Sequence, residues 1–174
     1  MDNGFNEYRA VARLAELLAI RRGFPPAVAK QIRIAALLHD VGKMKLPVEL
    51  LQKPGPLDRQ EFEVIKTHTT LGAEMMGSLR GELGEMVKNT CRWHHEWENG
   101  AGYWGIKASA LPPYIAIISI CDVYIALIHR RVYKPAWPVN AALEYIYSQA
   151  DKQFSRDLAD DFISLIHDGA AVVN

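Results

Sequence analysis

The stretch YIAIISICDVYIALI, residues 114–128, is almost continuously apolar and constrains how the chain can fold. It is shorter than the roughly 20 residues that a membrane-spanning helix needs. It also follows Pro112 and Pro113 and contains Asp122, and a charged side chain is costly inside a bilayer. The stretch therefore predicts a helix buried in a globular core, and no membrane contact is expected.

Local signals on either side of this stretch also predict helices. Apolar residues recur at helical spacing before Gly23, which can end a helix in the left-handed conformation. Pro25 and Pro26 suit the first turn of a second helix that runs through IRIAALL. Asp58 and Glu61 have the spacing of a capping box and predict the start of a further helix.

Helical patterns continue to the end of the chain, over about 69–79, 82–95, 113–129, 138–150 and 158–167. No stretch shows the period-two alternation that strands need. We therefore expect an all-α fold, a bundle of about seven to eight helices that forms one domain over residues 1–174. Residues 42–57 are expected to be a loop with one short turn, and 96–112 the largest irregular insertion.

Charge and cysteine content limit the partners and the compartment. Lys and Arg number 20 and so do Asp and Glu, so the net charge is zero and no overall field favours DNA. Cys91 and Cys121 are too few for a disulfide framework, which favours a reducing cytoplasm. The N-terminal segment MDNGFNEYRA lacks the basic and apolar regions of a signal peptide, so a cytoplasmic location is expected.

Imidazoles and carboxylates gather at the expected helix ends and inside the apolar helix. This set consists of His39, Asp40, His68, His94, His95 and Asp122. An isolated carboxylate in an apolar helix is costly unless a cation or hydrogen bonds compensate it. A single histidine at a helix end is usually only solvated, but the whole set predicts a non-haem metal site. Since no cysteine belongs to it, iron or manganese is favoured over structural zinc.

Several long motifs resemble the HD-GYP domain, a branch of the HD phosphohydrolase superfamily. They are HDVGK (39–43), LLQKPGPLDRQEFEVIKTHTTLGAEMM (50–76), HHEWENGAGYWG (94–105), LPPYIAIISICDVYIAL (111–127), RRVYK (130–134) and FSRDLADDFISL (154–165). The resemblance implies an all-helical phosphodiesterase that hydrolyses cyclic di-GMP to pGpG or GMP at a dinuclear metal centre.

The resemblance also implies roles for individual residues. Asp40 would bridge two divalent ions, most plausibly Fe or Mn; His68, His94 and His95 would hold one ion, and His39 and Asp122 the other. Lys43 would stabilise charge on the scissile phosphate; its alternative is a solvated loop lysine. Arg131 and Lys134 would grip phosphates, and Tyr103 would contact the substrate. Taken alone, Arg131 and Lys134 are typical of a capping pair at a helix C-terminus. A tyrosine in a glycine-rich loop, such as Tyr103, is commonly a surface anchor.

Three positions depart from the family pattern. Trp104 stands where the signature has proline, which puts the loop conformation and a GGDEF-type protein partner in doubt. Ile125 replaces a common aspartate, and Glu7 replaces a histidine ligand. Glu7 could still bind metal through its carboxylate, or it could be an exposed glutamate favoured by the helix dipole. Trp97 and Trp104 are possible anchors of a homodimer.

The sequence leaves three functions open. The first is an active cyclic di-GMP phosphodiesterase. In the second, the departures abolish turnover and the domain is a regulatory module that binds nucleotide or protein. The third is a hydrolase of another nucleotide phosphoester, because HD phosphohydrolases share a metal centre and differ in substrate.

Overall fold

The computed structural model describes residues 3–129 and 135–169, in which helices are joined by loops. Their α-helices are α1 (Asn3–Arg21), α2 (Pro26–Leu38), α3 (Val48–Leu51), α4 (Arg59–Lys66), α5 (His68–Met75), α6 (Gly81–Trp93), α7 (Pro113–Ile128), α8 (Val139–Ser148) and α9 (Arg156–His167). Two 3₁₀-helices are η1 (Val41–Lys45) and η2 (Ala108–Ala110). The predicted all-α fold is confirmed, and in the described ranges an isolated bridge between Ala150 and Phe154 is the only strand-like pairing.

The predicted helix boundaries have the expected backbone chemistry. Gly23 has a φ of 82°. The N–H groups of Gly23 and Phe24 donate to the carbonyls of Ile20 and Ala19, at 3.0 Å each, which is the Schellman pattern of a helix C-terminus. Asp58 accepts from the Glu61 N–H while the Glu61 side chain accepts from the Asp58 N–H, so the capping box is complete.

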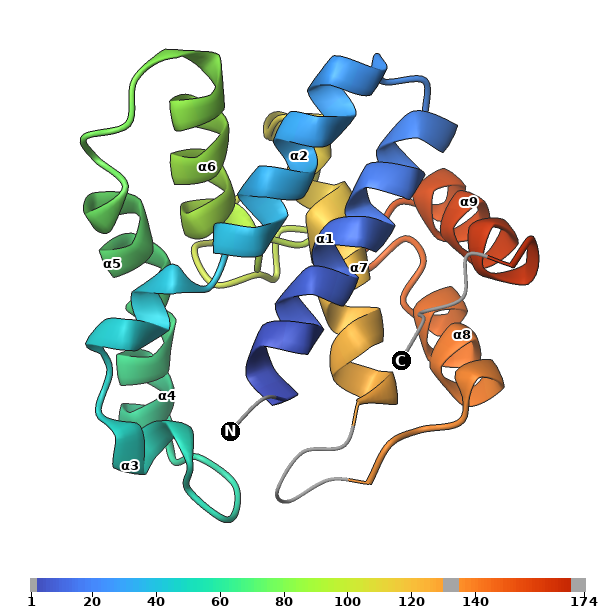
Figure 1. Ribbon diagram of the computed structural model, residues 1–174. Helices are drawn as coiled ribbons and strands as arrows, with labels where there is room; N and C mark the ends of the chain where they lie inside the picture. The colour runs from blue at the N-terminus through green and yellow to red at the C-terminus, as the bar shows by residue number, and fades with distance from the viewer. Residues whose placement is uncertain (1–2, 130–134, 170–174) are drawn as a thin grey trace.

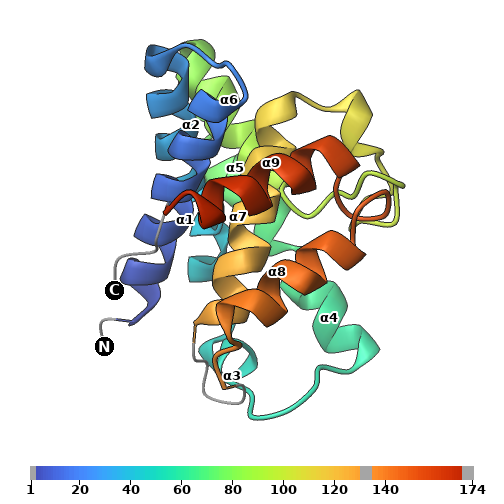
Figure 2. The same cartoon turned by 90° about the vertical axis from the view of Figure 1, so that its right-hand side faces the viewer.

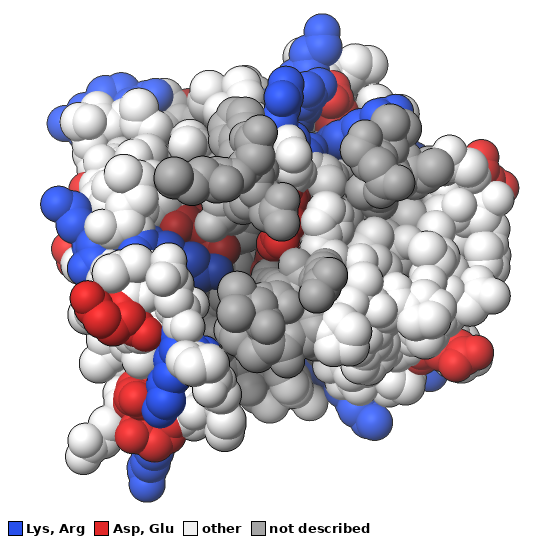
Figure 3. Space-filling view, turned by 60° about the horizontal axis from the view of Figure 1, so that its bottom comes forward, with Lys and Arg blue, Asp and Glu red and all other residues white. Residues whose placement is uncertain are grey.

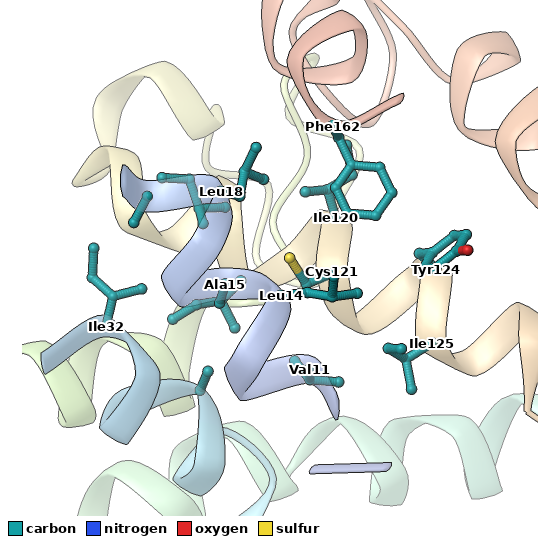
Figure 4. Close-up of a cluster of buried hydrophobic side chains, with 14 of the residues drawn as sticks. Val11, Leu14, Ala15, Leu18, Ile32, Ile120, Cys121, Tyr124, Ile125 and Phe162 are labelled. Atoms are coloured by element: carbon teal, nitrogen blue, oxygen red, sulfur yellow. The ribbon is translucent and has the colours of Figure 1, made fainter. Parts of the chain in front are cut away.

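Helix α7 carries the apolar stretch through the middle of the molecule, between α1 and the C-terminal helices (Figure 1). Its side chains Ile120 and Ile125 are at most 1% exposed, and they lie in the same buried cluster as Leu14 of α1 and Phe162 of α9 (Figure 4). The predicted buried helix is confirmed. No described helix is both long and apolar enough to cross a membrane.

Two groups of helices flank this centre. Helices α3 to α6 lie on one side of α1, α2 and α7, and α8 and α9 lie on the other (Figures 1 and 2). Helix α1 packs against α2, α7 and α9, and α6 packs against both α2 and α5. The ends of α2, α5 and α6 therefore approach one another beside the middle of α7.

The predicted loop over 42–57 and the helix that starts at residue 58 are more finely divided than expected. The loop contains η1 and the four-residue α3. The helix ends at Lys66, where the hydroxyl of Thr67 donates to the Val64 carbonyl at 2.6 Å. A side chain that occupies a backbone acceptor in this way competes with the continuing helix. His68 thus becomes the first residue of a new helix.

Gly42, in the motif HDVGK, is the point where η1 touches α5. A Cβ at this position would lie only 1.9 Å from the His68 carbonyl oxygen and 2.5 Å from the Gly72 nitrogen. These neighbours are backbone atoms and cannot turn aside. Glycine at position 42 is therefore what lets the segment after His39 and Asp40 pack directly on the start of α5.

Replacing Gly42 with alanine should lower the free energy of unfolding by about 3 kcal/mol, the upper end of the usual cost of overpacking, because the clash is with backbone and forces the two segments apart. Urea unfolding followed by circular dichroism measures this loss. Gly81→Ala is the control: its Cβ would meet open space, but the φ of 74° is unfavourable for alanine, at a cost of about 1 kcal/mol. Equal losses in both variants would contradict the packing argument.

Candidate metal centre

The predicted ligands come from helix ends that the fold brings together. His39 and His94 are the C-caps of α2 and α6, and His68 begins α5. These three residues are at most 1% exposed, and Asp40 is 6% exposed. Asp122 comes from the middle of α7, and its side chain keeps 20% of its surface in contact with solvent.

Three of the imidazoles are oriented by backbone carbonyls three or four residues earlier in the chain. Nδ1 of His39 lies 2.6 Å from the Ala36 carbonyl, and Nδ1 of His68 lies 2.6 Å from the Ile65 carbonyl. Nδ1 of His94 lies 2.9 Å from the Thr90 carbonyl. A carbonyl oxygen can only accept, so each Nδ1 carries the proton that it donates. The other ring nitrogen, Nε2, then points away from this carbonyl and is the atom that could bind a cation, which is the arrangement typical of metal-binding histidines.

All three Nε2 atoms point at Asp40, and they divide between its two oxygens. Oδ1 lies 3.2 Å from Nε2 of His68 and 3.6 Å from Nε2 of His94. Oδ2 lies 3.3 Å from Nε2 of His39, which is in turn 3.4 Å from Oδ1 of Asp122. Asp40 therefore stands between two sets of ligand atoms.

These atoms lack hydrogen bonds that would explain their burial. Within the described residues, Nε2 of His39 and Oδ1 of Asp40 are buried without a hydrogen-bond partner. The Nε2 atoms of His68 and His94 face each other at 3.4 Å. Buried polar atoms are normally paired, and an unpaired one is costly. A cation between the nitrogens and the carboxylate would satisfy all of them, so the residues present fit a metal.

His95 completes one side of this cluster. One ligand atom from each of Asp40, His68, His94 and His95 lies within 4.8 Å of the others. Burial lowers the pKa of His94, and burial is also the main cause that lowers the pKa of His95 well below its usual value. Both imidazoles are thus kept neutral, as metal ligation requires.

The carboxylates of Asp40 and Asp122 raise the pKa values of His39 and Lys43. Burial alone lowers the pKa of His39, but Asp40 and Asp122 outweigh it and raise this pKa to about 10. Lys43 forms an ion pair with Oδ2 of Asp40. Although burial lowers the pKa of Lys43, the charges of Asp40 and Asp122 raise it above its usual value. The ammonium group of Lys43 therefore lies at the edge of the cluster with its charge retained.

Tyr103 lies next to the cluster, as its predicted role requires. Its ring is 4.4 Å from the ring of His95, centroid to centroid, at an interplanar angle of 35°. Burial raises the pKa of Tyr103 to about 12, so its hydroxyl keeps its proton at neutral pH.

The molecular surface is hollowed on the face turned forward in Figure 3, and acidic side chains are visible inside the hollow.

The other predicted positions are Glu7, Arg131, Lys134 and Ile125. Glu7 is half-buried in α1 and is not among the four converging ligands, so metal binding by its carboxylate stays a prediction. Arg131 and Lys134 lie outside the described residues, and their contact with phosphates stays a prediction too. Ile125 points into the hydrophobic core, where it is 1% exposed.

Two residues near the cluster were missed by the sequence analysis. Tyr8 of α1 lies edge-on to His39 with ring centroids 5.6 Å apart, and burial and the charge of Asp40 raise its pKa. No sequence pattern distinguishes this tyrosine from any other on an amphipathic helix. Glu96 is 2% exposed; its place directly after two histidines was the available signal.

Comparison with known proteins identifies the class. The sequence profile of the HD domain family matches residues 2–158. The chain belongs to the HD domain family, and the resemblance on which the prediction was based is confirmed.

Among curated proteins, the cyclic di-GMP phosphodiesterase response regulator RpfG of Xanthomonas campestris pv. campestris is 34% identical over 161 residues, 91% of this chain and 43% of that protein. A cyclic di-GMP phosphodiesterase of Thermotoga maritima is 32% identical over 89% of this chain and 42% of its own length. The 3′3′-cGAMP-specific phosphodiesterase 2 of Vibrio cholerae is 32% identical over 89% of this chain and 31% of its own length. The chain thus spans less than half of each relative.

Solved structures share the fold at lower identity. Bd1817 of Bdellovibrio bacteriovorus, described as an HDG"Y"P protein, superimposes with a TM-score of 0.74 at 19% identity, covering 92% of this chain and 51% of that one. The HD domain of the phosphodiesterase PgpH of L. monocytogenes, in complex with cyclic-di-AMP, superimposes with a TM-score of 0.64 at 22% identity, covering 94% and 91%. These matches confirm the helical architecture.

Replacing Asp40 with asparagine should remove most of the bound metal, since the carboxylate stands between both sets of ligand atoms. Metal analysis after loading with Mn²⁺ measures the content directly. In the unmodified chain, a metal at a hundredfold excess over its Kd should stabilise the fold by about 2.7 kcal/mol, and the variant should lose this gain in thermal unfolding. Asp168→Asn, which alters a surface ion pair with Arg21, should keep it. Full metal content in the Asp40 variant would contradict the assignment.

Proposed function

We propose that this chain is a metal-dependent phosphodiesterase that hydrolyses cyclic di-GMP to pGpG or GMP. The observation that carries the proposal is the convergence of the imidazoles of His39, His68 and His94 on Asp40, each with Nδ1 turned to a backbone carbonyl and Nε2 turned inward. Such a site has no evident purpose without a cation. The names of the curated relatives, most of them cyclic dinucleotide phosphodiesterases, support the reaction and the class of substrate.

The geometry supports two metal positions that share Asp40. Oδ1 of Asp40 faces His68 and His94, and His95 would complete that first position. Oδ2 faces His39, and Asp122 lies beyond it, so these two residues would hold the second ion. Nitrogen and oxygen ligands without cysteine favour Fe or Mn over structural zinc.

Two divalent ions held there would supply an activated water and neutralise charge on the phosphate. The residues of the chain would do the rest. Lys43 would place its ammonium group on a non-bridging phosphate oxygen and stabilise the charge that develops as the ribose 3′ oxygen leaves. Tyr103, held against His95, would donate its hydroxyl hydrogen to the substrate. Arg131 and Lys134 would bind the second phosphate through charge-assisted hydrogen bonds.

The identity of the nucleotide has a second candidate. Relatives named as 3′3′-cGAMP-specific phosphodiesterases match this chain about as well as those named for cyclic di-GMP. The departures Trp104, Ile125 and Glu7 also keep open a regulatory module that binds without turnover. Hydrolysis measured on a panel of cyclic di-GMP, 3′3′-cGAMP and cyclic-di-AMP separates these possibilities, since binding without product would indicate the module.

We further propose that residues 1–174 act as one domain in a reducing cytoplasm. One buried cluster joins helices from α1 to α9, and both cysteines are buried as free thiols. Contact with a GGDEF-type protein and homodimer formation through Trp97 and Trp104 remain predictions.

Replacing Lys43 with methionine should lower kcat on the preferred cyclic dinucleotide by about a hundredfold, because one transition-state charge contact is lost. Metal content should stay unchanged, which separates this loss from a damaged metal site. Lys45→Met is the matched control, because Lys45 is exposed in the same short helix. If the Lys43 variant kept full activity, the proposed role of the ammonium group would be wrong.

A further inference from the structure

The loop after His95 is held by the buried carboxylate of Glu96. Its Oε1 accepts from the backbone N–H of Trp104 at 2.7 Å, and its Oε2 accepts from the N–H of Ile106 at 2.8 Å. Glu96 is 2% exposed, and a buried polar group that lost its hydrogen-bond partner would be costly. These two bonds close the loop onto the end of α6.

The closure sets the place of Tyr103. Gly102 packs so tightly that a Cβ would lie 2.5 Å from both the Cα of Glu96 and the carbonyl oxygen of His95. The N–H of Tyr103 donates to that same carbonyl at 3.4 Å. The loop backbone therefore holds the Tyr103 ring against the imidazole of His95.

Trp104 ties the loop to a second element, the start of α5. Its indole Nε1–H donates to the hydroxyl of Thr69 at 3.3 Å, one residue after His68. The ammonium nitrogen of Lys66 lies 5.4 Å from the centre of the Trp104 ring, within the range of a cation–π contact. Trp104 thus donates its backbone N–H to Glu96, the residue after His95, and its indole N–H to Thr69, the residue after His68.

A proline at position 104 could form neither bond, because it has no backbone N–H and no indole. One oxygen of the buried Glu96 carboxylate would then lose its partner. The tryptophan found where the HD-GYP signature has proline therefore supplies contacts that this loop uses.

From these contacts we infer that Trp104 is a positioning residue: it orders the loop so that Tyr103 lies over His95 beside the substrate. The inference deepens the proposed function and rests on it for its effect on substrate binding. It also reverses the expectation that the departure from proline weakens the site. The departure is compensated by Glu96 and Thr69, and the loop is ordered because of it.

The test compares Trp104→Pro with the unmodified chain, both loaded with Mn²⁺. We expect KM for cyclic di-GMP to rise about tenfold, the equivalent of one lost hydrogen bond to a charged group. Metal content and kcat should stay within about twofold, because no candidate metal ligand is changed. Amide hydrogen exchange in residues 97–107 should become faster, since the loop is released.

Two further variants keep the test decisive if the proline variant does not fold. Glu96→Gln leaves one acceptor oxygen for two N–H groups, and it should raise KM and speed up exchange in the same loop. Trp104→Phe keeps the backbone donor, and its effect should be smaller than that of proline. Glu98→Gln, the same chemical change two residues further on, is the control expected to alter neither measurement.

The Glu96 and Trp104 changes should also be coupled. In the Trp104→Pro background one N–H is absent, so Glu96→Gln should raise KM by a smaller factor than it does alone. Unchanged KM and exchange in both single variants would overturn the inference. If the unmodified chain hydrolyses no cyclic dinucleotide, the proposed function fails, and the exchange rates alone then decide whether Trp104 orders the loop.

Discussion

The candidate centre depends on one constraint: an imidazole that donates its Nδ1 proton to a backbone carbonyl must turn its Nε2 the other way. His39, His68 and His94 each meet this constraint through a carbonyl three or four residues earlier in the chain. A helix end is where such a carbonyl is free to accept. The orientation of the candidate ligands is therefore built into the ends of α2, α4 and α6.

The rest of the fold brings these helix ends to one point. Gly42 lets the segment after His39 and Asp40 touch the backbone of His68, with no room for a side chain. The break at Thr67 turns the chain so that His68 starts a new helix. Helix α7 passes through the core and carries Asp122 to the same place, where an otherwise costly carboxylate lies 3.4 Å from His39. The close contacts that pack these segments together are thus also the contacts that assemble the candidate site.

The loop after His95 shows how a departure from a family signature can be absorbed. Tryptophan at position 104 has a backbone N–H that proline lacks, and the buried Glu96 accepts it. The indole reaches Thr69 across the cluster. Whether a substitution weakens a site depends on the partners that the new residue meets. Here the backbone N–H and the indole N–H of Trp104 each have an acceptor.

The sequence by itself determined the helical class and most helix boundaries, because these depend on neighbours in the chain: Gly23 ends α1, and Asp58 with Glu61 begins α4. It also indicated the histidines and aspartates, since adjacent pairs and an isolated carboxylate in an apolar run are visible in one dimension. Only the tertiary structure decided that Oδ1 and Oδ2 of Asp40 face different partners, that Tyr8 lies against His39, and that Glu96 holds the loop. These contacts depend on how the helices and the loop are placed in space, and no local pattern encodes the distance or direction between their side chains.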